Sequence, residues 1–313
     1  MSKPDLLVIG PYPDWDMLAL AESYTLHRLW EAPDKSSFLS QHAENIQAIA
    51  TRGDLGASAE LMAQLPNLRI VSVFGVGTDG VDLAYARSKS IKVTNTPDVL
   101  TGDVADHGMA LLLAAARLMP QGDALVRSGK WPAGGLPLTT RVFGKKIGIV
   151  GMGRIGQAFA KRAQGFDCDI SYFSRGPRPG LPYRFVASLE ALAFEADFLV
   201  VTLAGGKGTR KIINASVLAA LGADGIFVNI SRGSTVDEEA LLAALESRSI
   251  KAAALDVFWN EPNINPRFLA LDNAVLHPHH ASGTVETRRA MGQLIRDNLA
   301  AHFAGESLLT PVA

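Results

Sequence analysis

Three side chains in this sequence have the types needed to hold an anion and transfer a proton, and each follows an apolar run typical of a buried strand. Arg232 follows GIFVNIS, Glu261 follows AAALDVF, and His279 follows AVLHP. Parallel sheets hold their sites at the carboxyl ends of their strands, so we expect these residues near one another. A cation and a proton donor aimed at one oxygen stabilise negative charge that develops there, and a neighbouring carboxylate favours the imidazolium. Taken singly, Arg232 would be a solvated loop charge and Glu261 a turn carboxylate.

A glycine pattern earlier in the chain has the form that binds the pyrophosphate of a dinucleotide. Gly151, Gly153 and Gly156 form G-x-G-x-x-G between an expected strand over 147–150 and an expected helix. Gly151 permits a tight turn, Gly153 lets the backbone approach the pyrophosphate, and Gly156 lets helix and strand pack closely. Arg154 is well placed to cover the phosphates. The alternative is a glycine-rich turn without a ligand.

The end of the next expected strand, over 169–173, indicates which dinucleotide is bound. NAD-binding chains place Asp or Glu there to hydrogen-bond the ribose 2′-hydroxyl, whereas a 2′-phosphate needs cationic and hydroxyl donors. This chain has Ser174 and Arg175. A hydroxyl can donate to the phosphate, and a guanidinium can bind it in a forked geometry. The sequence therefore predicts NADPH as the cofactor, with NADH as the weaker alternative.

A second glycine-rich turn lies in the first third of the chain, in FGVGTDGVDL. After a strand, the successive amides of Val76 and Gly77 can form a small anion-binding nest. Arg52 follows another expected strand end and can line the same site. A purely structural glycine turn is the alternative, because such turns commonly follow strands.

Together these motifs resemble the D-isomer-specific 2-hydroxyacid dehydrogenases, most closely the glyoxylate/hydroxypyruvate reductases and the hydroxyphenylpyruvate reductases. The resemblance covers nearly the whole chain and is carried by FGVGTDGVDL, NTPDVLTGDVAD, GMGRIG, ISRG, DVFWNEP and PHHASGTVETR, in the family's order and at its spacings. One segment departs from the family's pattern. TLAGGKGTR replaces a leucine-threonine-proline segment, so contacts near Leu203 and Thr209 do not carry over.

The resemblance implies a role for each site residue. Arg232 would bind the carboxylate and carbonyl of a 2-keto acid, His279 would donate the proton, and Glu261 would orient and tune that imidazole. The amides of Val76 and Gly77 would bind the substrate carboxylate. Further dinucleotide contacts carried over from the motifs are Met152, Ile155, Ile230, Asp256 and Ser282.

The run HPHH offers three histidines for one role. The resemblance selects His279, because it follows Pro278 and precedes the Ala-Ser pair by one residue. We interpret His277 and His280 as packing or surface residues. A metal site is the remaining alternative, but no other ligand cluster is evident. We expect no metal.

The elements that must position these residues alternate between short apolar, β-branched runs and helix-period segments. This alternation predicts an α/β fold with two doubly wound, parallel-sheet, Rossmann-like domains and a cleft between them. We expect a substrate-binding (lid) domain over 1–99, completed by a C-terminal helix over 284–313, and a dinucleotide-binding domain over 100–283. The polar, glycine-rich segment 127–143 is long enough to form an arm over a second copy of the chain, so we expect a homodimer. Trp131 would anchor that arm or shape a substrate pocket.

Composition excludes several classes of partner. The 313 residues carry a formal net charge of −1, with 48% hydrophobic and 19% charged residues, so no strong field for nucleic acid or a membrane surface is expected. The N-terminus lacks the long apolar region of a signal peptide, and we expect a cytoplasmic protein. Cys168 is the single cysteine and cannot form an internal disulfide.

The sequence thus predicts an NADP-dependent reductase of a small 2-keto acid, glyoxylate or hydroxypyruvate, yielding the D-2-hydroxy acid. Two alternatives stay open. One is a reductase for a bulkier aromatic keto acid of the hydroxyphenylpyruvate type. The other is a dinucleotide-sensing regulatory protein, which efficient turnover of a keto acid would exclude.

Overall fold

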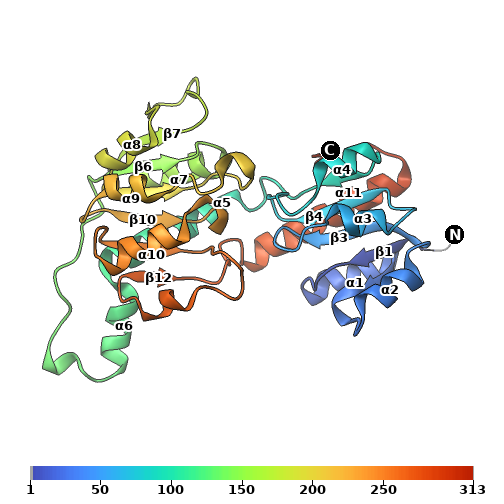
Figure 1. Ribbon diagram of the computed structural model, residues 1–313, viewed down its shortest axis with the longest axis horizontal. Helices are drawn as coiled ribbons and strands as arrows, with labels where there is room; N and C mark the ends of the chain where they lie inside the picture. Colours follow the sequence, from blue (N-terminus) through green and yellow to red (C-terminus); the bar gives the residue numbers. More distant parts are fainter. Residues whose placement is uncertain (1–2, 313) are drawn as a thin grey trace. The chain divides into compact units, whose positions relative to one another are not determined.

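The computed structural model describes residues 3–312 and divides the chain into two compact units (Figure 1). Unit 1 contains the chain up to Leu100 and from Ser282 onward, and unit 2 contains Thr101–Ala281. The sequence placed these boundaries after residues 99 and 283. The chain therefore passes from one unit to the other twice.

Unit 1 is built on a five-stranded parallel sheet with the order β2-β1-β3-β4-β5, one of the two common doubly wound orders. Helices α1 and α11 pack against each other, and α11 also packs on β4. The core cluster of this unit contains Leu7, Ile49, Val71 and Val93 from the strands. The elements are β1 (Asp5–Val8), α1 (Asp14–Ser23), β2 (Thr25–Arg28), α2 (Lys35–His42), β3 (Ile46–Arg52), α3 (Ala59–Ala63), β4 (Ile70–Phe74), α4 (Leu83–Ser88), β5 (Lys92–Thr94) and α11 (Val285–Ala304).

Unit 2 is built on a seven-stranded parallel sheet with the order β12-β11-β10-β9-β6-β7-β8. Its strand order reverses between β6 and β9, where doubly wound sheets bind their ligands. Helices α8, α9 and α10 lie beside one another along the sheet. The elements are α5 (Thr101–Arg117), α6 (Met119–Arg127), β6 (Lys146–Val150), α7 (Arg154–Gln164), β7 (Asp169–Phe173), β8 (Arg184–Phe185), α8 (Leu189–Glu195), β9 (Phe198–Val201), α9 (Ala215–Leu221), β10 (Ile226–Asn229), α10 (Glu238–Glu246), β11 (Ala252–Leu255) and β12 (Ala274–Leu276).

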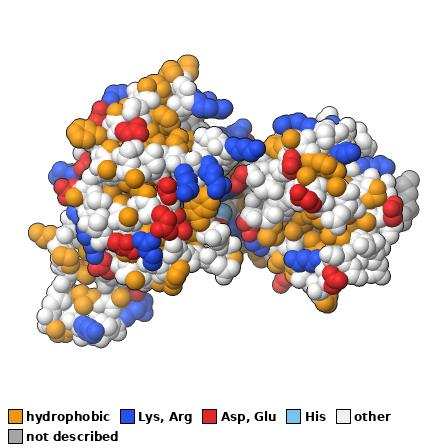
Figure 2. Space-filling model, in the orientation of Figure 1, with side chains coloured by type: hydrophobic (Ala, Val, Ile, Leu, Met, Phe, Trp, Pro, Cys, Tyr) orange, Lys and Arg blue, Asp and Glu red, His pale blue; other side chains and the backbone are white. Residues whose placement is uncertain are grey.

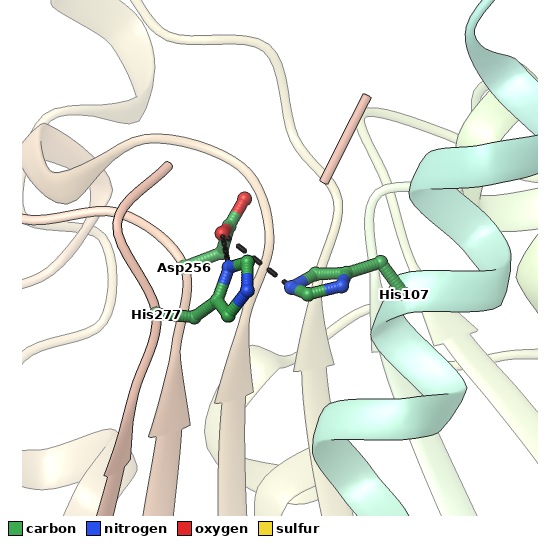
Figure 3. A group of neighbouring side chains, drawn as sticks. All are labelled: His107, Asp256 and His277. Atoms are coloured by element: carbon green, nitrogen blue, oxygen red, sulfur yellow. Dashed lines mark hydrogen bonds and ion pairs between the residues drawn. The ribbon is translucent and has the colours of Figure 1, made fainter. Parts of the chain in front are cut away.

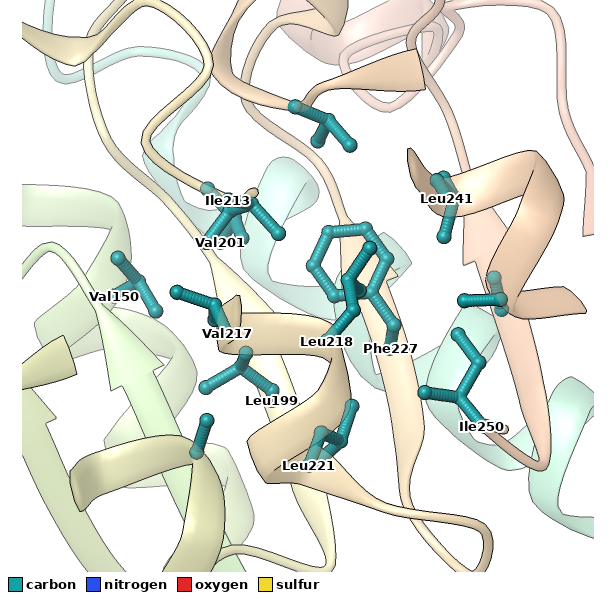
Figure 4. Close-up of a cluster of buried hydrophobic side chains, with 14 of the residues drawn as sticks. Val150, Leu199, Val201, Ile213, Val217, Leu218, Leu221, Phe227, Leu241 and Ile250 are labelled. Carbon is teal, nitrogen blue, oxygen red and sulfur yellow. The ribbon is translucent and has the colours of Figure 1, made fainter. Parts of the chain in front are cut away.

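The central strands of unit 2 are apolar throughout because helices cover both of their faces. Every residue of β9, β10 and β11 is buried. On the face of α8, α9 and α10, Phe227 and Leu199 pack against Leu218 and Leu241 (Figure 4). Full burial of each such side chain stabilises the fold by about 1.5–3 kcal/mol. This core fixes the strand ends that carry the site residues. Two parallel-sheet α/β domains were expected, and this expectation is confirmed.

The C-terminal helix is shorter than the sequence led us to expect. The expected span was 284–313, whereas α11 ends at Ala304. Gly305 adopts a left-handed conformation (φ 74°) and caps the helix. The chain then runs back along β5, where Val312 donates its amide to Val93. Residues 1, 2 and 313 of the expected first domain lie outside the described residues.

A buried ion pair holds α11 to the start of unit 1. The Arg296 guanidinium bonds to the Asp16 carboxylate, which is wholly buried. Burial raises the pKa of Asp16, and the bonds from Arg296 oppose that rise. Gly292 lies directly against the same carboxylate, so that a Cβ at this position would collide with it. Helix α11 is therefore held to α1 of unit 1 both by an ion pair and by the close approach of its backbone at Gly292.

The segment after α5 extends away from the rest of unit 2 (Figure 1). It consists of α6, a short 3₁₀ turn at Trp131–Ala133, and an extended stretch before β6. Several of its apolar side chains are exposed, and hydrophobic atoms are visible on it at the lower left of Figure 2. They are Met119, Val126, Trp131, Leu136, Leu138 and Phe143.

Within residues 3–312, no single helix has the length and hydropathy needed to cross a membrane. Helices α5 and α6 meet that test only as a pair, and they are bent by 63° at the break between them.

Candidate active site

The glycine turn between β6 and α7 has the geometry expected of a dinucleotide-binding loop. Gly151 has a φ of 106°, and a Cβ there would lie 2.9 Å from the Leu203 nitrogen. A Cβ on Gly156 would lie 2.1 Å from the Gly151 oxygen, so both positions require glycine. A Cβ on Gly153 would meet no atom within 4 Å. The exposed side of the turn at Gly153 is therefore open to a ligand, next to the start of α7, where anions bind favourably.

The remaining residues of this loop divide between the core and the surface. Met152 is buried, Ile155 is half-buried, and Arg154 is exposed. The hydroxyl of Thr202, after β9, donates to the Gly151 carbonyl at 2.5 Å. Segment 202–210 after β9, which departs from the family's pattern, thus packs against the glycine turn through Thr202 and Leu203. Thr209 lies farther along and donates to the Ala204 carbonyl at 2.8 Å.

The end of β7 carries the residues expected to select NADPH. Arg175 is exposed, whereas the half-buried Ser174 donates its hydroxyl to the Gly176 carbonyl at 2.6 Å. The buried Tyr172 hydroxyl accepts the Arg178 amide at 2.7 Å and so folds the loop over the strand end. Ser174 would have to exchange its bond to Gly176 for one to a phosphate. Arg175 is already exposed in a loop that Tyr172 holds in place.

The structure brings Glu261 and His279 together, although they come from different strand ends. His279 Nδ1 lies 2.6 Å from Glu261 Oε2, and Glu261 Oε1 accepts the Phe258 amide at 2.7 Å. Because a carboxylate only accepts, we assign the Nδ1 proton to this hydrogen bond, which leaves Nε2 to face a substrate. His279 has a φ of 48°, a conformation unusual for a residue with a side chain. The backbone is held so that the imidazole meets the carboxylate.

Arg232 lies on the turn that follows β10 and is half-buried. Its Nη1 donates to the Ser231 carbonyl at 2.8 Å. The next residue, Gly233, lies against the backbone of Phe258, where a Cβ would be 2.1 Å from the Phe258 carbonyl carbon. The turn with Arg232 and the loop with Glu261 are therefore in direct contact.

A second carboxylate, Asp256, forms a cluster with His107 and His277 (Figure 3). This cluster adjoins the Glu261–His279 pair. Asp256, at the end of β11, is almost fully buried. Its Oδ1 lies 2.8 Å from His277 Nδ1 and 3.4 Å from His107 Nε2, and the two imidazole rings are 4.2 Å apart. Burial opposes ionisation of Asp256, but bonds from His107, the His280 amide and His277 outweigh it and hold its pKa below the ordinary value. Asp256 is therefore ionised at neutral pH.

The same carboxylate holds the backbone next to the catalytic candidate. Asp256 accepts the amides of His280 at 2.9 Å and Ala281 at 3.1 Å, the two residues that follow His279. These two bonds hold the backbone directly after His279. His280 is exposed, as expected, whereas His277 has a carboxylate partner that the sequence did not indicate.

The donor atoms of His107, Asp256 and His277 lie within 4.8 Å of one another and have types that bind Zn²⁺. Ligands at 2.0–2.1 Å from a tetrahedral zinc would be about 3.3 Å apart. The 2.8 Å separation of His277 Nδ1 and Asp256 Oδ1 is instead that of a hydrogen bond. We interpret the cluster as a carboxylate held by imidazoles.

One of the remaining expected site residues, Ile230, lies in unit 2 and is buried. The others lie in unit 1. Val76 is exposed, Gly77 is half-buried, and Asn95 holds their turn by donating to the Val76 carbonyl at 2.9 Å. Arg52 donates through Nε to Asp54 at 3.0 Å and through Nη2 at 2.5 Å. This bidentate pair already engages the cation and weakens the case for Arg52 as an anion ligand. Ser282 is half-buried at the first residue of the returning chain.

The fold and the glycine turn define a two-domain dehydrogenase of the NAD(P)-binding class. The chain belongs to the D-isomer specific 2-hydroxyacid dehydrogenase family, because the model of that family's NAD binding domain matches residues 109–281. The resemblance noted from the motifs is thereby confirmed.

Three relatives are similar over essentially the whole chain, each 46% identical. A glyoxylate/hydroxypyruvate reductase A from Arabidopsis thaliana and a hydroxyphenylpyruvate reductase from Plectranthus scutellarioides match over 312 residues, covering 100% of both chains. A 2-ketogluconate reductase from Gluconobacter oxydans matches over 311 residues, covering 99% of both.

Two solved structures have the same fold. A 2-hydroxyacid dehydrogenase from Ketogulonicigenium vulgare is 54% identical with a TM-score of 0.93, covering 100% of this chain and 99% of its own. An NADPH-dependent glyoxylate/hydroxypyruvate reductase from Sinorhizobium meliloti, in complex with NADP and malonate, is 42% identical with a TM-score of 0.94, covering 100% and 97%. The chain is thus an oxidoreductase of the 2-hydroxyacid type with an NAD(P)-binding domain.

Proposed function

We propose that this protein reduces a small 2-keto acid, such as glyoxylate or hydroxypyruvate, to the D-2-hydroxy acid with NADPH. The observation that carries the proposal is the 2.6 Å contact between His279 and Glu261 in a chain of this family. A histidine whose Nδ1 is bonded to a carboxylate can carry a proton on Nε2 and remain oriented while it gives that proton away.

In the proposed reaction, NADPH held through its pyrophosphate at the glycine turn would supply a hydride from its nicotinamide to the keto carbon. Arg232 holds the substrate carboxylate and polarises the carbonyl oxygen, on which negative charge develops. His279 gives its Nε2 proton to that oxygen, and Glu261 stabilises the imidazolium before the transfer. The amides of Val76 and Gly77 in unit 1 would bind the substrate carboxylate as well, with unit 1 as the substrate-binding domain and unit 2 as the dinucleotide-binding domain.

The preference for NADPH is proposed from the residues at the end of β7. Ser174 and the exposed Arg175 stand where a carboxylate would repel a 2′-phosphate, and the Sinorhizobium meliloti relative was solved with NADP. Gly153 and the start of α7 would receive the pyrophosphate, and Ile230, Asp256 and Ser282 would lie along the rest of the cofactor.

The second candidate is reduction of a larger keto acid, because relatives of equal identity bear the names hydroxyphenylpyruvate reductase and 2-ketogluconate reductase. The test is the initial rate of NADPH and NADH oxidation with glyoxylate, hydroxypyruvate, hydroxyphenylpyruvate and 2-ketogluconate, with chiral analysis of the product. We expect the highest kcat/KM with NADPH and one of the two small acids. Faster turnover of a large acid would move the substrate assignment, and tight NADPH binding without any turnover would favour the regulatory alternative.

We also propose a homodimer held by the projecting segment from α6 to β6, since its exposed apolar side chains would be covered by a second copy. A cytoplasmic location stays a prediction.

A further inference from the structure

The turn that carries Arg232 is held by a buried side chain, Asn229, which is 1% exposed at the end of β10. Asn229 Oδ1 accepts the Ser231 amide at 3.0 Å, and Asn229 Nδ2 donates to the Arg232 carbonyl at 3.0 Å. The amide thus bonds to the chain on both sides of the peptide that leads into Arg232. Neither bond involves the guanidinium.

A second buried side chain holds the same carbonyl from the other direction. Thr235, which is fully buried, donates its hydroxyl to the Arg232 carbonyl at 2.6 Å. The Arg232 carbonyl therefore accepts from Asn229 and Thr235 together. Buried hydrogen bonds of this kind restrict the backbone because leaving any of these groups unpaired is costly.

The turn held in this way is packed against the loop of the proposed proton donor. Gly233 lies on the backbone of Phe258, and the Phe258 amide donates to Glu261 Oε1 at 2.7 Å. Glu261 in turn bonds to His279 at 2.6 Å. A shift of the Arg232 turn would therefore act directly on the loop that orients the imidazole.

We propose that Asn229 is a positioning residue that fixes the guanidinium of Arg232 relative to the Glu261–His279 pair. This inference rests on the function proposed above, because it requires Arg232 to bind the substrate. Asn229 acts only through the backbone, so its loss should weaken substrate capture while leaving the glycine turn that would bind the pyrophosphate intact. A displacement of about 1 Å at a reacting group can cost about a hundredfold in rate.

The test compares Asn229→Ala and Thr235→Val with the wild type. We expect Asn229→Ala to raise the KM for the keto acid and to lower kcat/KM by about ten- to a hundredfold, with the Kd for NADPH within about twofold. Thr235→Val keeps the side-chain shape and removes a single bond, so we expect a smaller change in the same direction. It also provides the measurement if Asn229→Ala does not fold.

Asn273→Ala is the matched control. Asn273 is another buried asparagine of unit 2, and it donates to the carbonyls of Leu245 and Lys251 far along the sheet from Arg232. We expect this variant to lower Tm without raising the KM. An equal rise in KM for Asn273→Ala and Asn229→Ala at matched Tm loss would show that Asn229 is merely structural and would overturn the inference.

A double-mutant cycle with Arg232→Ala tests whether Asn229 acts through Arg232. Calorimetric binding of oxalate, an unreactive analogue of a 2-keto acid, to the NADP complex provides the readout. If Asn229 acts through Arg232, the double variant binds oxalate no more weakly than Arg232→Ala alone, whereas additive losses contradict the inference. Unchanged oxalate binding by Arg232→Ala would instead remove the proposed function and the inference with it.

Discussion

At the scale of single residues, two imidazoles are each paired with a carboxylate, the arrangement that suits a histidine to proton transfer. His279 bonds to Glu261, whose other oxygen is held by the Phe258 amide, and the ring is only part-buried. His277 has a similar bond to Asp256, but its ring also contacts the His107 ring in a tilted arrangement. Geometry therefore offers two histidines, and the register of the family favours His279.

We expect His279→Gln to lower kcat by at least about a hundredfold, because general acid catalysis contributes about 10²–10⁴ to rate. The Kd for NADPH should stay within about twofold, since the variant leaves the glycine turn untouched. Stopped-flow hydride transfer and fluorescence titration of NADPH provide the two numbers. His277→Gln is the matched comparison, and a larger loss of kcat in that variant would transfer the proton-donor role to His277.

Arg175→Asp should reverse the cofactor preference. Loss of a charge-assisted hydrogen bond costs about 1.5–3 kcal/mol, and the new carboxylate would also repel the 2′-phosphate. We expect kcat/KM with NADPH to fall by more than about tenfold and the value with NADH to change by less than about threefold. Arg178→Asp, on the following loop, serves as the control. Equal losses with both cofactors would show that Arg175 does not contact the phosphate.

At the scale of elements, helix α11 links the stability of unit 1 to pH through His302. Burial lowers the pKa of His302, and the charges of Arg69 and Lys92 add to this effect. The unfolded chain therefore binds a proton at higher pH than the folded one does. Stability from this group is complete above about pH 6.5 and declines as the pH falls below that value, because the unfolded state then holds more protons.

His302→Gln should remove this part of the pH dependence. We expect the Tm of the wild type to fall more than that of the variant between pH 7.5 and pH 5.5. Differential scanning calorimetry at several pH values measures the difference. Parallel decreases in the two proteins would assign the acid sensitivity to other groups.

The elements also show which features could be predicted from the sequence. The glycine turn was predictable because its three glycines, its strand and its helix lie within one short stretch. The true end of α11 was marked by Gly305, a residue typical of helix ends, although the expected helix ran to residue 313. His107 gave no local signal. It lies inside an apolar helix, and only the packing of α5 on the sheet brings it to Asp256.

At the scale of the whole molecule, the proposed homodimer rests on the exposed apolar side chains after α5. Leu138 is 102% exposed and Trp131 is 62% exposed. We expect the double variant Trp131→Asp and Leu138→Asp to be monomeric by light scattering at micromolar concentration, while the wild type is a dimer. Phe194→Asp provides the control, since Phe194 is 78% exposed on α8. A monomeric wild type, or a dimer in the double variant, would contradict the proposed role of this segment.

The discontinuity of unit 1 has a consequence for synthesis on the ribosome. Unit 2 is one uninterrupted stretch, Thr101–Ala281, and can become compact while the rest of the chain is still being made. Unit 1 must wait for α11, because Arg296, which neutralises the buried Asp16, and Val312, which pairs with Val93, are both made after unit 2. The stretch of unit 1 that precedes unit 2 is thus completed only after unit 2 has been made. Until then the buried strand β4 lacks the helix that packs on it in the folded protein.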